Sequence, residues 1–320
     1  MCERVDSLSP QASVAASLLI SFLKDAGYRF ITPTPATHLR VNGRAESQRA
    51  ETLADAFGWN RPFAGGLIPN PLLQSLKEEG LVVEAAAGLK SIFRVSTLDD
   101  DLLLHSSFPT IAQDAVFFGP DTYRFARAIK CHLKDRPVLG RALDLGCGSG
   151  AGGVALARSS MCKELMFSDI NEAALRVAAL NAGFASLGRV ATVRSNLFAN
   201  IEGMFDLIVS NPPYLNDPLE RAYRHGGGEL GSGLSIRIAK EATDRLTPGG
   251  SLVMYTGSPI VRGVDRLRHA IEENFAGRDL RWAYEEIDPD VFGEELETAA
   301  YKHVDRIAAV VLTATRREGL

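Results

Sequence analysis

From about residue 139 onward, short apolar runs alternate with stretches that carry a helical pattern. The apolar runs, each long enough for one strand, are RALDLG, KELMFSD, RVATVRS, FDLIVSN and GGSLVMYTG. Two more runs near the end, DLRWAYEEI and VDRIAAVVLTATR, predict two further strands. Alternation of this kind is typical of βαβ units. It predicts an α/β fold with a mainly parallel, seven-stranded sheet that helices cover on both faces.

The first 138 residues are less regular, and residues 1–116 predict a smaller domain. SVAASLLISFLKDAG and PNPLLQSLKEEG read as helices that end at glycine. LVVEA, a turn, IFRVST and DLLLHSS follow as strands. Helix, hairpin and strand in this order suggest a winged-helix-like module, acting as a cap over the substrate or as a dimerisation domain. We therefore expect an N-terminal domain over 1–116, a catalytic domain over 117–320 and a homodimer formed through the first.

Composition narrows the class of protein. The chain has 320 residues and a net charge of −4, and residues 1–138 carry 15 basic and 15 acidic groups. A protein that neutralises many phosphates is expected to be basic. No run of about 18 uncharged apolar residues occurs, and the start MCERVDSLSP does not look like a secretory signal. We expect a cytoplasmic protein outside the membrane. The four cysteines lack the spacing of a metal site.

The stretch LDLGCGSGAGGVALA, residues 143–157, predicts a strand, a glycine-rich turn and a helix start. Gly146, Gly148 and Gly150 permit backbone conformations and a close ligand approach that a Cβ would block. Gly148, Gly150 and Gly153 also spell the dinucleotide pattern G-x-G-x-x-G. The glycines therefore leave two ligands open, a dinucleotide and S-adenosylmethionine.

Two aspartates flank this turn. Asp169 ends the second strand, about 20 residues after the turn, and its carboxylate can accept hydrogen bonds from the ribose hydroxyls of either ligand. It can also act only as a helix N-cap. Asp144 lies within the first strand, where a carboxylate would repel a pyrophosphate but would support the cationic amino end of S-adenosylmethionine. Asp144 therefore favours S-adenosylmethionine.

Over about residues 117–257 the chain resembles the class I S-adenosylmethionine-dependent methyltransferases. LDLGCGSG is similar to their motif I, and an acid stands at the end of the second strand. The resemblance implies a Rossmann-like methyltransferase sheet, S-adenosylmethionine as cofactor and no metal. It implies cofactor contacts from Asp144, Gly146, Gly148, Gly150, Asp169, Ile170, Asn196 and Leu197. Asn196 departs from the family, because many members have an aspartate there and an amide offers no charge.

The fourth run is followed directly by Asn211-Pro212-Pro213-Tyr214. Prolines cannot continue a strand, so the strand must end there. The side-chain oxygen of Asn211 and the carbonyl of Pro212 can accept the two N–H groups of one planar nitrogen, while Tyr214 packs on a planar or cationic group. This tetrapeptide resembles that of adenine-N6, guanine-N2 and release-factor glutamine methyltransferases. The resemblance implies transfer of a methyl group to a nitrogen.

Three residues are candidates for substrate contact. Tyr123, in FFGPDTYRFARAI, is a candidate for the mouth of the site. Arg224 and His225 precede three consecutive glycines that read as a mobile lid, and they can bind a substrate carboxylate. The lid suggests a small enclosed site. With the missing basic surface, it leads us to expect a small-molecule substrate rather than a nucleic acid, while a protein side chain stays open as the substrate.

Three other functions stay open on sequence alone. The acceptors that hold a foreign nitrogen can also hold the cofactor's own amine, which would then attack Cγ and give azetidine-2-carboxylate and methylthioadenosine. A second alternative is a binding module that uses the cofactor without catalysis, although such a module has no need of the Asn211–Tyr214 constellation. A dinucleotide-dependent oxidoreductase is the third.

Overall fold

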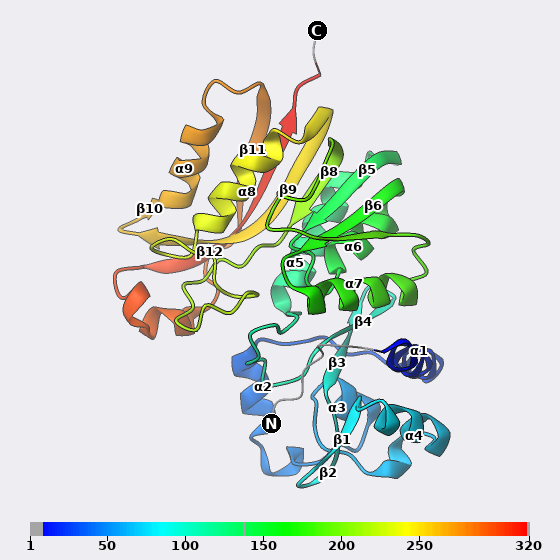
Figure 1. Cartoon of the computed structure of the whole chain (residues 1–320). Helices are drawn as coiled ribbons and strands as arrows, with labels where there is room; N and C mark the ends of the chain where they lie inside the picture. Colours follow the sequence, from blue (N-terminus) through cyan, green and yellow to red (C-terminus); the bar gives the residue numbers. More distant parts are fainter. Residues whose placement is uncertain (1–8, 137, 319–320) are drawn as a thin grey trace.

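The computed structural model describes residues 9–136 and 138–318. Figure 1 shows a smaller N-terminal part beside a larger part built on a central sheet. The N-terminal part contains α1 (Pro10–Asp25), α2 (Pro35–Asn42), η1 (Ala45–Ser47), α3 (Leu53–Phe57), η2 (Gly65–Leu67), α4 (Asn70–Glu78), β1 (Val82–Ala85), β2 (Gly88–Ser91), β3 (Phe93–Leu98) and β4 (Asp101–Ser106). The larger part contains α5 (Pro120–Leu133), β5 (Val138–Leu145), α6 (Ala151–Ser159), β6 (Met161–Asp169), α7 (Glu172–Phe184), β7 (Ala191–Arg194), β8 (Phe205–Ser210), α8 (Gly233–Thr243), β9 (Leu246–Val261), β10 (Val264–Asp265), α9 (Arg266–Phe275), β11 (Leu280–Asp288), η3 (Gly293–Glu297), η4 (Ala299–Tyr301) and β12 (Arg306–Arg316).

The central sheet confirms the predicted seven strands. Their order is β11-β12-β9-β8-β5-β6-β7, and the two-residue strand β10 is added against β9. β5 to β9 run parallel to one another, whereas β12 is antiparallel to both β9 and β11. After β7 the chain returns to β8, on the other side of β5. Ligands of open α/β sheets bind at this reversal, beyond the carboxyl ends of the strands.

Helices cover both faces of the sheet (Figure 1). On one face Phe125 of α5 and Val154 of α6 belong to a core with the inner side chains of the strands. On the other face Ile238 of α8 and Ile271 of α9 belong to a second core. The central strand β8 is consequently buried along almost its whole length, as its continuous apolar run FDLIVS predicts.

The N-terminal part packs against α7. Leu19 and Leu23 of α1 share a core with Ala174 and Val177 of α7. Lys24, at the end of α1, donates a hydrogen bond of 2.7 Å to the carbonyl of Phe184. One face of α7 therefore covers the central sheet while another holds the N-terminal part.

The strands of the N-terminal part form two hairpins, not one. β1 pairs with β2, and β3 pairs with β4. The expected pairing of LVVEA with IFRVST is therefore wrong. The buried Asn60 side chain donates to the Ser91 carbonyl at 2.9 Å, where β2 ends, and so stabilises the break. The second hairpin turns at Asp99, which has a φ of 54°. A helix is thus followed by two hairpins, and the winged-helix likeness and the 116/117 boundary stay predictions.

Asn181 connects three parts of the chain. Its side chain is fully buried and makes hydrogen bonds to both the N–H and the carbonyl of Leu104 in β4, at 2.8 and 2.9 Å. It also donates to the carbonyl of Ser149 in the glycine-rich turn, at 2.8 Å. Asn181 and Gly183 stand in the sequence where the C-cap of this helix is expected, but α7 continues to Phe184. The side-chain amide of Asn181 instead makes hydrogen bonds to backbone groups of β4 and of the glycine-rich turn.

Within residues 9–136 and 138–318, none of the helices has both the length and the apolar character that crossing a bilayer requires. The cytoplasmic location and the homodimer stay predictions.

Replacing Asn181 by Ala should lower the free energy of unfolding by about 3 kcal/mol or more, because three buried backbone groups lose their partner. Urea unfolding followed by circular dichroism measures this. The exposed Asn200 provides the control, and Asn200→Ala should change stability by about 0.5 kcal/mol at most. Equal effects of the two substitutions would contradict a connecting role for Asn181.

Candidate active site

The predicted cofactor residues gather around one cavity of about 350 Å³, which we call the cofactor cavity. It lies beyond the carboxyl ends of β5, β6, β7 and β8, where the sheet reverses direction. Seven of the eight predicted cofactor residues line it: Asp144, Gly146, Gly148, Asp169, Ile170, Asn196 and Leu197. Asn211 and Pro212 line the same cavity. The sheet thus brings the predicted acceptors next to the predicted cofactor residues.

The glycine turn forms one wall of this cavity. Gly146 and Gly148 have φ values of 69° and 50°, and a Cβ on either would meet no atom within 4 Å. Side chains here would therefore fill the cradle rather than collide with the protein. Gly150 corrects the prediction, because it does not line the cavity. A Cβ on Gly150 would lie 3.0 Å from Ala178, so this glycine lets α6 approach α7.

Asp144 is 1% exposed and lies behind the turn. Its carboxylate accepts a 2.7 Å hydrogen bond from the N–H of Gly153 at the start of α6. Burial raises the pKa of Asp144 to about 8, with the Gly153 hydrogen bond opposing the shift and the charge of Asp169 adding to it. A cation in the cavity would favour the ionised form. This carboxyl group therefore suits the amino group of S-adenosylmethionine.

Asp169 is held by two backbone groups. Gly148 and Asn171 each donate an N–H to its carboxylate at 2.9 Å. Burial raises the pKa of Asp169, and these hydrogen bonds oppose the shift. Asn171, not Asp169, caps α7, because its side chain accepts from the N–H of Ala173. The Asp169 carboxylate therefore does not cap α7, and it lines the cavity.

Apolar and polar side chains both line the cavity beyond β6 and β7. Ile170, which follows β6, is apolar and 53% exposed. Leu197, with a φ of 51°, and the exposed Asn196 lie beyond β7. This combination fits a flat heterocycle with one amino edge, as the adenine of the cofactor has.

Asn211 follows the last residue of β8. Ser210 pairs with Leu145 in the register of β8 and β5, and its hydroxyl donates to the Leu145 carbonyl at 2.7 Å. Asn211 and Pro212 line the cofactor cavity and also a neighbouring cavity of about 50 Å³, which Tyr214 and Phe292 line as well. The two predicted acceptors therefore stand where the two cavities meet.

Tyr214 is fixed by a buried carboxylate. Its hydroxyl donates to Oδ2 of Asp121 at 2.7 Å, and Tyr255 donates to Oδ1 at 2.6 Å. Asp121 is 3% exposed, and burial raises its pKa while the hydrogen bonds from Tyr255 and Tyr214 oppose the shift. The Tyr214 ring packs edge-on to Phe292. Its orientation is therefore set within the protein.

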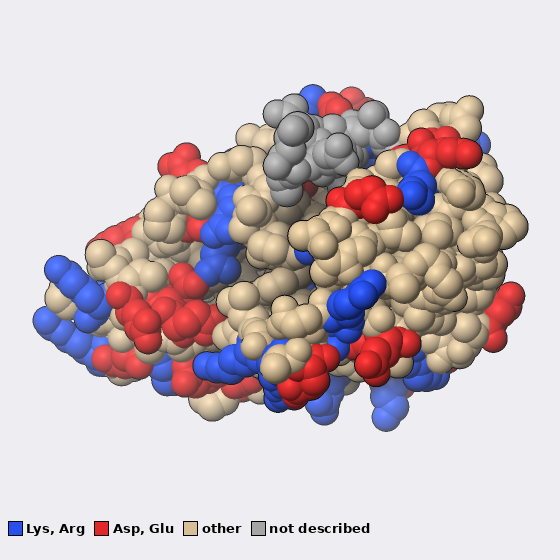
Figure 2. Space-filling view, turned by 90° about the horizontal axis from the view of Figure 1, so that it is seen from below, with Lys and Arg blue, Asp and Glu red and all other residues tan. Residues whose placement is uncertain are grey.

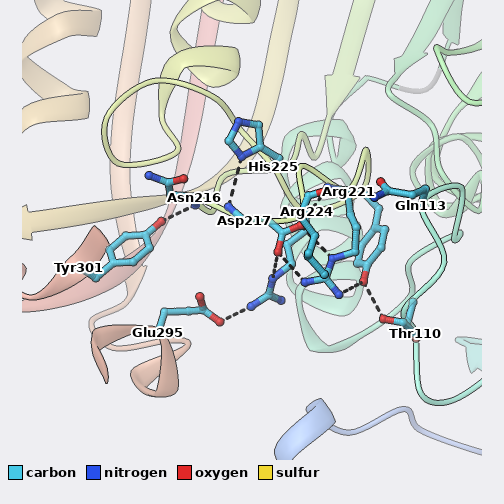
Figure 3. Close-up of polar contacts among 11 residues, drawn as sticks. Thr110, Gln113, Asn216, Asp217, Arg221, Arg224, His225, Glu295 and Tyr301 are labelled. Atoms are coloured by element: carbon cyan, nitrogen blue, oxygen red, sulfur yellow. Dashed lines mark hydrogen bonds and ion pairs between the residues drawn. The ribbon is translucent and has the colours of Figure 1, made fainter. Parts of the chain in front are cut away.

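The segment after Tyr214 packs tightly on it. A Cβ on Gly226 would lie 2.6 Å from the Pro213 carbonyl, and the N–H of Gly226 donates to the Leu215 carbonyl at 2.9 Å. Figure 3 shows Asp217 between Arg221 and Arg224. The Arg221 hydrogen bonds hold the pKa of Asp217 below its ordinary value. The glycines predicted as a lid thus permit close backbone contact with the Asn211–Tyr214 loop.

Residues 126–262 match the family described as "Methyltransferase small domain". The match lies within the larger part of the chain, which is therefore similar to these domains and is called the methyltransferase domain from here on. The match confirms the resemblance to class I S-adenosylmethionine-dependent methyltransferases, with S-adenosylmethionine as their cofactor. The cradle at Gly146 and Gly148, the buried Asp144 and the exposed Ile170 fit that cofactor.

Two relatives with different names are similar to part of this chain. A ribosomal RNA small subunit methyltransferase C of Pasteurella multocida is 35% identical over 118 residues, which are 37% of this chain and 33% of the relative. A release factor glutamine methyltransferase of Rhodopirellula baltica is 35% identical over 152 residues, which are 43% of this chain and 51% of the relative. The chain thus spans about half or less of these relatives.

One solved structure shows the same fold. It is from Streptococcus mutans, assigned as a SAM-dependent methyltransferase, and has a TM-score of 0.50 at 12% identity. The alignment covers 70% of this chain and 55% of that one.

The expectation of a small-molecule substrate is wrong. Both relatives are named for action on a macromolecule, ribosomal RNA in one case and a release factor in the other. The expectation rested on an enclosed site with a lid. The structure shows the supposed lid packed against the Asn211–Tyr214 loop, so the glycines gave no information about substrate size.

The three predicted substrate residues lie in different places. His225 lines the cofactor cavity, and its Nδ1 accepts from the N–H of Asp217 at 3.2 Å. Arg224 lines the smaller cavity and forms ion pairs with Asp217 and Glu295. Tyr123 does not stand at the mouth. Its hydroxyl accepts from the N–H of Thr32, so it joins the methyltransferase domain to the N-terminal part.

Sequence reasoning missed several residues of the methyltransferase domain. The rings of Phe117 and Tyr223 stack with centroids 6.3 Å apart and line both the cofactor cavity and its smaller neighbour. Phe292 and Glu295 belong to VFGEELE, residues 291–297, for which a return to the site from the C-terminal strands was open on sequence alone but had no physical argument, and both residues reach the site. The signal for Phe117 was present in FFGPDTYRFARAI.

Asp144→Asn should change how stability depends on pH. The folded pKa of about 8 lies above the ordinary value of about 3.9, so the folded protein holds an extra proton and loses stability as pH rises between these values. Without cofactor, wild type should lose on the order of a few kcal/mol of unfolding free energy relative to the variant between pH 4 and 8. Urea unfolding at several pH values measures this. Parallel pH profiles would rule out the raised pKa.

Proposed function

We propose that the protein transfers the methyl group of S-adenosylmethionine to a planar amide or exocyclic amino nitrogen of a macromolecular substrate. The observation that carries the proposal is the position of Asn211 and Pro212 at the junction of the cofactor cavity and the smaller cavity. The named relatives support methylation, and nothing in them favours cyclisation of the cofactor.

The chain's own residues orient the target nitrogen. Oδ1 of Asn211 accepts one N–H and the carbonyl of Pro212 accepts the other, which turns the nitrogen lone pair toward the cofactor cavity. Pro212 and Pro213 have no N–H that would compete for these acceptors. When bound, S-adenosylmethionine supplies an electrophilic methyl group. No strong base is needed, because the proton can leave for solvent once the nitrogen carries the methyl group.

Tyr214 forms part of the wall of the smaller cavity, and neighbouring side chains hold it in place. The hydrogen bond to Asp121 and the contact with Phe292 hold the ring in one orientation. A planar amide or base can pack on such a fixed ring without loss of side-chain entropy. Tyr255 and Arg124 share the Asp121 carboxylate and keep it in place.

Asn211→Ala should abolish methyl transfer while the dissociation constant for S-adenosylmethionine changes little, because Asn211 holds the nitrogen and not the cofactor. Transfer is measured with methyl-labelled S-adenosylmethionine on bacterial ribosomal RNA and, separately, on a bacterial release factor. Asn274→Ala on α9 is the control and should leave transfer unchanged. An equal loss of cofactor binding in Asn211→Ala would make Asn211 a cofactor ligand. Absence of transfer by wild type to both substrates would count against the proposed function.

Asp169→Ala should have the opposite effect. Loss of charge-assisted hydrogen bonds to the cofactor should weaken its binding by about 1–3 kcal/mol. Isothermal titration calorimetry with S-adenosylhomocysteine measures this without turnover. An unchanged dissociation constant would exclude the ribose-holding role of Asp169.

A further inference from the structure

A separate cavity of about 270 Å³ lies between the N-terminal part and the methyltransferase domain. Phe117 and Tyr223 line it together with the cofactor cavity, so the two cavities adjoin at this aromatic pair. Prolines form much of its remaining wall: Pro33, Pro35 and Pro109. A group bound here would therefore lie beside the nitrogen held at Asn211.

Arg94 brings a positive charge to this cavity. It is 4% exposed, and its Nε and Nη2 donate to the carbonyl of Ser106 at 3.0 Å and the hydroxyl of Thr110 at 3.4 Å. Within residues 9–136 and 138–318, no carboxylate forms an ion pair with it. Burial lowers the pKa of Arg94 to about 10, which leaves it charged at neutral pH. A buried charge of this kind calls for a counter-ion.

The other two arginines of the cavity are already neutralised. Arg221 makes two hydrogen bonds to the carboxylate of Asp217, and Arg224 forms ion pairs with Asp217 and Glu295 (Figure 3). These pairs leave Arg94 as the uncompensated guanidinium among the arginines that line the cavity. One ligand anion would balance it.

His38 adds an unused acceptor to the cavity. Its side chain is fully buried, and Nε2 lies 2.8 Å from the carbonyl of Trp59. A carbonyl can only accept, so Nε2 carries the proton and Nδ1 carries a lone pair. Nδ1 is buried and has no hydrogen-bond partner. Burial and the charge of Arg94 lower the pKa of His38 to about 4, so the ring is neutral at pH 7.

We propose that this interdomain cavity binds an acidic side chain of a protein substrate, close in sequence to the methylated amide. The carboxylate binds Arg94, and an adjacent peptide N–H donates to Nδ1 of His38. The inference rests on the proposed function and narrows its substrate to a protein. It requires the N-terminal part to contribute directly to substrate recognition, through Arg94 and His38.

Charge favours a protein over RNA as the occupant. A polyanion needs many uncompensated cations along its path, and the chain has a net charge of −4. Figure 2 shows Lys and Arg side chains interspersed with Asp and Glu on the face that it presents, without a continuous basic field. A single buried guanidinium with a single acceptor matches one carboxylate and one N–H. Proline and aromatic walls suit the apolar remainder of a peptide.

The test measures binding without catalysis. Full-length protein loaded with S-adenosylhomocysteine is titrated calorimetrically with acetyl-Glu-Gly-Gln-Gly-amide and with the matched acetyl-Gln-Gly-Gln-Gly-amide. Wild type should bind the acidic peptide at least about tenfold more tightly. Arg94→Met should bind both peptides equally, because it keeps the volume of the side chain and removes the charge. Arg29→Met, in the same part of the chain and 73% exposed, is the control and should keep the preference.

Each result decides the proposal. Equal affinities of wild type for the two peptides would overturn it, and this comparison does not depend on any variant being folded. A preference that survives in Arg94→Met would overturn it too. Tight binding of a six-nucleotide single-stranded RNA that is lost in Arg94→Met, without an acidic-peptide preference, would assign the cavity to a phosphate. If wild type prefers the acidic peptide but methylates neither RNA nor a release factor, the proposed function fails while the subsite stands.

Discussion

The pairing of β5 with β8 is the contact on which the site depends. The two strands are far apart in sequence, yet the reversal of the sheet makes them neighbours and places Leu145 opposite Ser210. The Ser210 hydroxyl then bonds the Leu145 carbonyl and joins the two strand ends. Everything that follows those ends, the glycine turn on one side and Asn211 on the other, takes its relative position from this register. A slip of β8 by one residue would turn its side chains to the opposite face of the sheet.

Buried carboxylates give this site its rigidity and its charge. Asp121 takes hydrogen bonds from two tyrosines and so fixes the aromatic wall, whereas Asp144 has a single backbone donor and keeps the capacity to meet a cation. The two acids are similarly buried, but their surroundings differ. For these two acids, the number of donors distinguishes the structural role of Asp121 from the ligand-binding role proposed for Asp144.

The sequence predicted the sheet and most of the cofactor residues because both depend on local patterns. The apolar strand runs, the glycine turn and Asp169 can each be recognised from a window of about ten residues. Gly150 was assigned to the cofactor because a glycine in the sequence looks the same whether it makes room for a ligand or for the contact with Ala178. Asn181 was read as a cap because its partners Leu104 and Ser149 are distant in sequence. The glycines near 226 were read as flexible because tight backbone packing requires the same residue.

The buried amide of Asn181 has a consequence for how the two parts of the chain behave together. It bonds β4 of the N-terminal part and the turn that cradles the cofactor through one side chain. Separating the parts would therefore remove a support of the cradle, and a ligand that holds the cradle in place would hold the parts together. Thermodynamic reciprocity requires the effect to run in both directions with equal size. Cofactor affinity and the docking of the two parts are therefore coupled through this amide.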